Sequence, residues 1–155
     1  MADISLRDVL LTIHVICAVI WVGGGVALNV LATRILRADP DILRPMIKTF
    51  DWVVNRTIIP ASLLVLIFGV ILVIEGVWDF SDTFVILGII GGVSTFVLGI
   101  TVLSPRLRLQ EKLWDEHGDQ SEIASKALAR TLLIARIDVV MLLVIVGIMV
   151  TKPAV

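Results

Sequence analysis

The sequence predicts an all-α integral membrane protein, an antiparallel four-helix bundle with both termini outside the cytoplasm. Three observations predict this fold class. The 155 residues are 58% hydrophobic with a mean hydropathy of +1.04, which is more apolar than ordinary soluble domains. Four separate apolar stretches are each long enough to cross a bilayer as a helix, which takes roughly 20 residues. The lysines and arginines gather in two of the three connections between these stretches.

The first two predicted spans cover about residues 9–36 and 57–74. Neither shows the alternation of a barrel strand, so we expect helices. Pro60 falls within the first turns of the second span, where proline is tolerated. The segment before it, residues 42–56, is typical of an amphipathic helix lying at the membrane interface. Its apolar positions recur at helical spacing: Leu43, Met46, Ile47, Phe50 and Val54.

The third and fourth spans are predicted at about residues 83–103 and 131–150, with a charged segment between them. Gly118 predicts a helix break within that segment, and Ser121 is a candidate N-cap. We therefore expect these two spans to extend into the cytoplasm as a helical hairpin within one four-span domain, residues 1–155. The apolar residues that predict its packing are Leu107, Leu113, Trp114, Ile123, Ala127 and Leu128.

The distribution of positive charge predicts the orientation. Of the 13 lysines and arginines, five belong to the first connection and six to the third, which leaves two for the termini and the second connection. Cytoplasmic loops carry the excess of these residues, so both termini are expected on the extracytoplasmic side of a cell inner (plasma) membrane. The net charge of −1 gives no basic field that would attract a nucleic acid.

His14 is the one histidine within an apolar stretch. Ionisable residues in membrane spans are costly and mark function. A neutral imidazole there can ligate haem iron or copper, or pass on a proton. Because each chain has one such histidine, two axial imidazoles on a haem b would require a symmetric homodimer. The structural alternative is a histidine inside the bundle that bonds a neighbouring carbonyl.

Copper is the alternative cofactor. Met141 lies in the fourth span at a depth broadly similar to that of His14, and Met149 lies nearer the outer surface. With the single cysteine, Cys17, these side chains are credible ligands for cuprous copper. Methionine in an apolar helix is otherwise a filler of irregular gaps, and a lone cysteine is otherwise a small buried side chain.

Four further residues are candidates for cofactor contact. Trp21 and Gly25 share the helical face of His14, and glycines near a bulky indole leave clearance either for a flat cofactor or for a neighbouring helix. Arg34 and Arg136 lie near the inner ends of their spans, and the arginine fork matches a haem propionate. Either arginine could instead pair with Asp138, which would offset the desolvation of both charges.

Two families resemble this sequence. Residues 14–24 read HVICAVIWVGG, which resembles the HxxxAxxWxGG opening of the CopD copper-resistance membrane domain and of uncharacterised bacterial membrane proteins of similar length. The second span and the last span, with Asp138 and Met149, resemble the same group. A more distant likeness is to the four-span HemJ-type protoporphyrinogen oxidases, in which the matching histidine is implicated in haem b binding. Their third span contains a lysine and a histidine, whereas residues 84–99 here read FVILGIIGGVSTFVLG.

Three functional readings follow. The first is a redox protein that holds haem b through His14 and exchanges electrons with a partner. The second is a copper-binding or copper-transport module that uses His14 with Met141, Met149 or Cys17. The third is a membrane scaffold or accessory subunit without catalysis, in which His14 only joins helices. No phosphate-binding loop, zinc-protease helix or serine-centred triad motif is present in the sequence.

Overall fold

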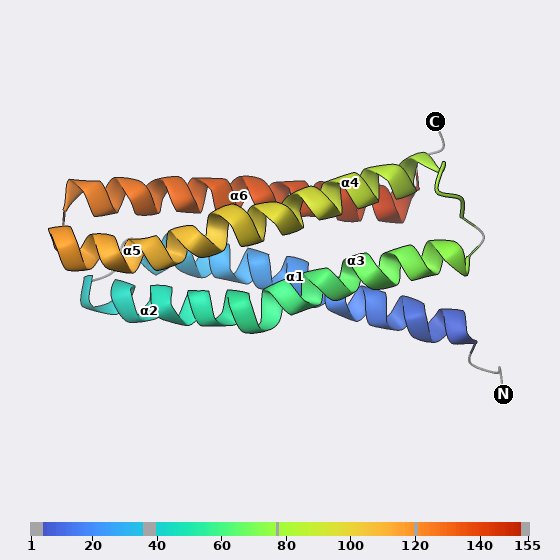
Figure 1. Ribbon diagram of the computed structural model, residues 1–155, viewed down its shortest axis with the longest axis horizontal. Helices are drawn as coiled ribbons and strands as arrows, with labels where there is room; N and C mark the ends of the chain where they lie inside the picture. Colours follow the sequence, from blue (N-terminus) through green and yellow to red (C-terminus); the bar gives the residue numbers. More distant parts are fainter. Residues whose placement is uncertain (1–4, 36–39, 77, 120, 153–155) are drawn as a thin grey trace.

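The computed structural model describes residues 5–35, 40–76, 78–119 and 121–152, and within these ranges the chain forms helices and turns but no strand. The helices join into four long antiparallel rods (Figure 1), each long and apolar enough to cross a membrane. This confirms the predicted all-α membrane fold class. The elements in order are α1 (Leu6–Ile35), α2 (Pro40–Val53), η1 (Val54–Ile58), α3 (Ile59–Ile74), α4 (Thr83–Leu98), η2 (Gly99–Leu103), α5 (Ser104–His117) and α6 (Glu122–Thr151).

The first helix begins at the end of the molecule where the last helix ends. α1 begins and α6 ends at what we call the terminal end, and α2 and α5 lie at the opposite, distal end (Figure 1). α1 packs mainly along α3, and α4 packs mainly along α6. α1 also contacts α6, and α3 contacts α4, so the four rods enclose a common interior.

Two of the rods contain a π-helical turn. η1 joins α2 to α3, and η2 joins α4 to α5, without a break in either rod. Each turn directly precedes a helix whose second residue is a proline, Pro60 or Pro105. Proline has no N–H to donate and its ring clashes with the carbonyl four residues earlier, which lies inside the π turn. The widened turns accommodate both prolines without ending the helix.

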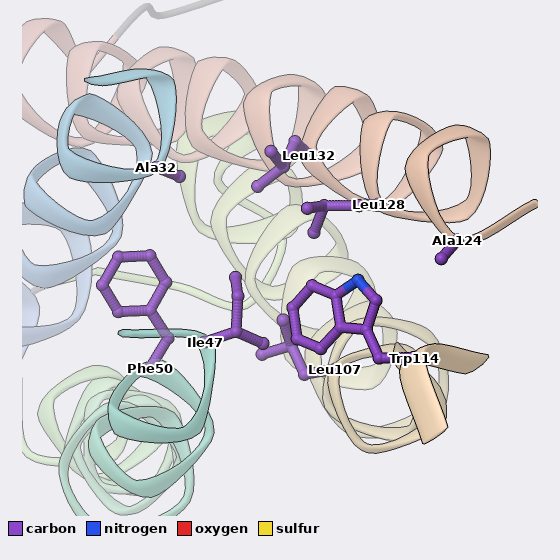
Figure 2. Close-up of a cluster of buried hydrophobic side chains, with 8 residues drawn as sticks. All are labelled: Ala32, Ile47, Phe50, Leu107, Trp114, Ala124, Leu128 and Leu132. Carbon is purple, nitrogen blue, oxygen red and sulfur yellow. The ribbon is translucent and has the colours of Figure 1, made fainter. Parts of the chain in front are cut away.

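The best-buried apolar cluster lies at the distal end. α2, α5, the last turns of α1 and the first half of α6 form a unit that we call the distal bundle, and their buried side chains meet at its centre (Figure 2). These residues are Ala32, Ile47, Phe50, Leu107, Trp114, Ala124, Leu128 and Leu132. Burial of such a cluster is the main source of stability for this part of the molecule.

Two expectations about the distal region were wrong. Residues 42–56 do not form a separate helix lying along the membrane surface, because α2 continues through η1 into α3 and buries Ile47 and Phe50 against α5 and α6. Ile123 is 55% exposed, and Ala124 takes the buried position instead. Both differences arise because the amphipathic face packs against protein, where the partner helices decide which residue points inward.

The charged outer face of the distal bundle indicates that this end stands beyond the lipid. Ion pairs link α2 to α5: Lys48 to Glu111 at 3.8 Å and Asp51 to Arg108 at 3.6 Å. Arg44 also contacts Asp115 on α5. Exposed charges of this kind cannot lie in hydrocarbon.

The predicted hairpin between the third and fourth rods is confirmed. α5 ends at His117, and Gly118 has a φ of +86°, which glycine adopts without steric cost. The side-chain oxygen of Ser121 then accepts a hydrogen bond of 3.2 Å from the Ala124 N–H, as an N-cap does.

Candidate functional site

A partly open cavity of about 110 Å³ lies between the four rods, at the level where the spanning helices meet the distal bundle. All four rods contribute to its walls, with Trp21 from α1, Phe96 from α4 and Asp138 from α6 among them. Both π turns also line it, through Ile58 and Gly99 among other residues. The two prolines therefore place their irregular turns on either side of one interior space.

Asp138 is the ionisable group in this cavity. Its side chain is 8% exposed, and the buried oxygen Oδ1 has no hydrogen-bond partner among the described residues. The predicted ion pair with Arg34 or Arg136 is wrong. Arg136 instead donates from Nη2 to Thr33 Oγ1 at 3.1 Å, and Arg34 is exposed near the same end of α1. Neither arginine lines the cavity, so nothing described in the structure neutralises the carboxylate.

Asn29 also lines the cavity, on α1 opposite the α6 helix that contains Asp138. Its Nδ2 donates to the carbonyl of Gly25 at 3.0 Å and to the carbonyl of Ala135, one turn before Asp138 on α6, at 3.4 Å. Its Oδ1 is buried and also lacks a partner among the described residues. Sequence reasoning did not single out Asn29, although an amide inside an apolar span was the signal available.

The buried hydroxyls of the cavity already donate their hydrogens to backbone carbonyls. Ser62 donates to the carbonyl of Ile59 at 2.8 Å, and Thr131 donates to that of Ala127 at 3.0 Å. Thr95 lies 3.0 Å from the carbonyl of Gly92 on its own helix. Because each hydroxyl has a single hydrogen, these side chains offer an occupant only their lone pairs.

His14 lies outside this cavity. Since a carbonyl can only accept, Nδ1 carries the proton and donates to the backbone oxygen of Val65 on α3 at 3.0 Å. The ring packs against Gly69, where an added Cβ would lie 3.1 Å from Cε1. The predicted structural alternative, a bond to a neighbouring carbonyl, is therefore present. Nε2 has no hydrogen-bond partner among the described residues.

The position of His14 is at the border between interior and lipid-facing surface. One turn earlier on α1, Leu11 is 41% exposed, whereas Cys17 three residues later is buried. Met141 is 38% exposed on α6. Met149 packs its methyl group beside Gly88 on α4. Cys17 is therefore buried on α1, Met141 is exposed on α6 and Met149 contacts α4, and no contact between these sulfur atoms and the imidazole is present among the described residues.

Two of the predicted site residues do reach the cavity. Trp21 is buried and lines it, and Gly25 lines it where α1 approaches Val139 of α6. Across the described ranges, no three side chains of histidine, cysteine, aspartate or glutamate are grouped so that they could hold a metal ion. Of the predicted site residues, Trp21 and Gly25 thus line the cavity, whereas His14 faces α3.

A comparison with protein families matches residues 8–153 to a family model described as a predicted integral membrane protein, DUF2269. The match covers all four rods. No curated protein and no solved structure matches this chain.

Proposed function

We propose, from the premise that this chain belongs to the DUF2269 family of predicted integral membrane proteins, that it binds haem b through His14. It would do so in a bacterial inner membrane with both termini on the extracytoplasmic side. The observation that carries the proposal is the hydrogen bond from Nδ1 to the Val65 carbonyl. Histidines that bind metals commonly donate their other ring N–H in this way, which fixes the tautomer and leaves the Nε2 lone pair for the metal.

The size of the interior cavity decides where a haem could lie. An apolar cavity of about 150 Å³ holds one benzene ring. The cavity of about 110 Å³ is therefore far too small for a porphyrin, and His14 does not line it. A haem held by His14 would therefore lie outside this cavity. Because each chain has one such histidine, a second copy would supply the other imidazole, so the proposal includes a homodimer.

Arg34 and Arg136, which the sequence suggested for propionate binding, lie too far from His14 to contact the same haem. α1 is continuous from His14 to Arg34, and 20 residues at a rise of 1.5 Å separate them by about 30 Å, more than the width of a porphyrin. Arg136 bonds Thr33 and so lies at the same distant level. What this chain supplies is one oriented imidazole in an apolar setting, and haem iron held there would supply one-electron chemistry to a partner.

The resemblance of the first span to the HemJ-type oxidases supports a haem role for His14 alone. The copper reading is less well supported, because Met141 is 38% exposed on α6 and Met149 packs beside Gly88 of α4, whereas His14 bonds Val65 of α3. The scaffold reading rests on the same bond to Val65, which by itself gives His14 a structural role.

An absorption spectrum with metal analysis of the protein in mild detergent separates these readings. We expect a Soret band in the wild type and in His117→Ala, which removes the exposed histidine of the distal turn, and no band in His14→Ala. Bound copper without a Soret band would move the assignment to copper. A protein without metal or colour would overturn the proposal and leave His14 as a structural residue.

A further inference from the structure

We propose that the interior cavity is a binding site for a small ammonium ion, either ammonium itself or a short primary alkylammonium. In this site the carboxylate of Asp138 and the amide oxygen of Asn29 receive its N–H groups. The site is separate from His14 and does not depend on any cofactor. Three properties of the cavity carry the proposal: its charge, its hydrogen-bonding groups and its size.

The negative charge of the Asp138 carboxylate favours a cation in the cavity. Asp138 is more than nine-tenths buried, and its Oδ1 lacks a partner among the described residues. The arginine nearest in sequence, Arg136, is engaged with Thr33 on the outside of the bundle. An uncompensated buried carboxylate is strongly unfavourable, and a cation whose N–H groups are hydrogen-bonded to it offsets part of that cost.

The polar groups on the walls match an ammonium ion. Both hydrogens of the Asn29 amide are used on backbone carbonyls, while its Oδ1 is left without a partner. The buried hydroxyls of Ser62, Thr95 and Thr131 also face backbone carbonyls of their own helices. Apart from the indole of Trp21, these side chains therefore offer acceptors. An ammonium group has three or more N–H donors and no acceptor, so it complements them.

The size and the apolar lining select the kind of cation. The cavity of about 110 Å³ admits a group of a few heavy atoms. Aromatic side chains, Trp21, Phe50 and Phe96, form part of the wall. The face of an aromatic ring attracts an ammonium charge, and such rings also pack against a short alkyl chain. A hard metal cation prefers six or more oxygen ligands, which this mostly apolar wall does not supply.

Equilibrium binding of methylammonium, measured by titration calorimetry on the purified protein in detergent, tests the proposal. We expect saturable binding to the wild type and to Glu116→Gln, a matched loss of an acid on the exposed face of the distal bundle. Asp138→Asn keeps the shape and removes the charge, so its affinity should fall about tenfold or more, as expected for loss of a charged hydrogen-bond partner. Asn29→Ala should also weaken binding, which provides a second variant if the first does not fold.

Competition identifies the ligand class. Ammonium and ethylammonium should displace methylammonium, whereas tetraethylammonium, which is larger and has no N–H, should not. Equal binding by the wild type and Asp138→Asn, or no saturable binding of any primary ammonium, would overturn the proposal. Displacement by sodium or potassium at the same concentrations would also overturn it, because the site would then select inorganic cations. None of these outcomes depends on whether His14 binds haem.

Discussion

His14 and Val65 are joined across the α1–α3 contact by a 3.0 Å hydrogen bond from a side chain to a backbone carbonyl. The bond passes beside Gly69, whose missing side chain leaves room for the imidazole. Within a span, where water cannot replace a lost bond, such a contact fixes both the rotation of α1 and the tautomer of the ring. The contact therefore couples the chemistry of His14 to the packing of two helices.

Gly69→Ala should reduce stability in the wild type but not when His14 is absent. The added Cβ would lie 3.1 Å from Cε1, so the ring must shift by a few tenths of an ångström, and we expect this shift to weaken its bond to Val65. In a His14→Ala background the same change meets open space and gains the higher helix propensity of alanine, about 1 kcal/mol. We expect a coupling energy of about 1 kcal/mol in a double-mutant cycle of unfolding in detergent. Additive effects would contradict the contact.

Asp138→Leu should stabilise the protein when no ammonium ion is present. The change removes a buried oxygen that has no partner and replaces it with an apolar side chain facing a mostly apolar cavity. Replacement of buried, poorly compensated charge by apolar residues is neutral or stabilising by about 1–4 kcal/mol. Thermal unfolding monitored by tryptophan fluorescence measures the shift, with Glu116→Leu on the exposed face as the control. A lower unfolding midpoint for Asp138→Leu would show that the carboxylate has a partner.

The fold follows from the sequence more fully than the site does. Apolar stretches of sufficient length predict four spanning helices whatever their partners, and Gly118 and Ser121 predict the hairpin because both act locally. Residues 42–56 were misplaced because an amphipathic helix shows the same pattern against a membrane surface as against α5. The difference lies in the partner, which a one-dimensional pattern does not contain.

The cavity could be predicted only in part. Helical spacing placed Trp21 and Gly25 on the same face as His14, and in the structure Trp21 and Gly25 line the cavity while His14 does not. Asp138 was visible in the sequence as a charge within its span. The sequence does not reveal that the π turns before Pro60 and Pro105 line the same cavity, although each proline predicts a local irregularity of its helix. Nor does spacing along α1 reveal that His14 turns toward α3 while the residues a turn or two later face the interior, because that border depends on how the neighbouring helices are arranged.

The core of the distal bundle should contribute far more stability than its ion pairs. Trp114 is a buried member of the cluster, and truncation of such a side chain to alanine costs about 3–5 kcal/mol. Arg44 pairs with Asp115 and Asp119 on the exposed face, where pairs of this kind contribute under about 1 kcal/mol and are screened by salt. Denaturant unfolding of Trp114→Ala and Arg44→Ala, at low and high salt, measures both. A larger loss for Arg44→Ala would reverse this ranking.

The orientation can be tested with two cysteines at opposite ends of the bundle. Glu75 follows the last turn of α3 at the terminal end, and Glu116 lies near the end of α5 at the distal end; both are exposed glutamates. The positive charge of the distal connections predicts that the distal end is cytoplasmic. In a Cys17→Ser background, a maleimide that cannot cross membranes should therefore label Glu75→Cys in intact cells and Glu116→Cys only after permeabilisation.

The removal of Cys17 keeps the labelling specific, and its burial means that a serine there has little effect on accessibility at either end. The two positions are matched in residue type and exposure, so a difference in labelling reports the side of the membrane and not the reactivity of the thiol. If only Glu116→Cys were labelled in intact cells, the orientation in the membrane would be the reverse of the one predicted. The lysines and arginines of the distal bundle would then face outward, against the bias that sets the topology of membrane proteins.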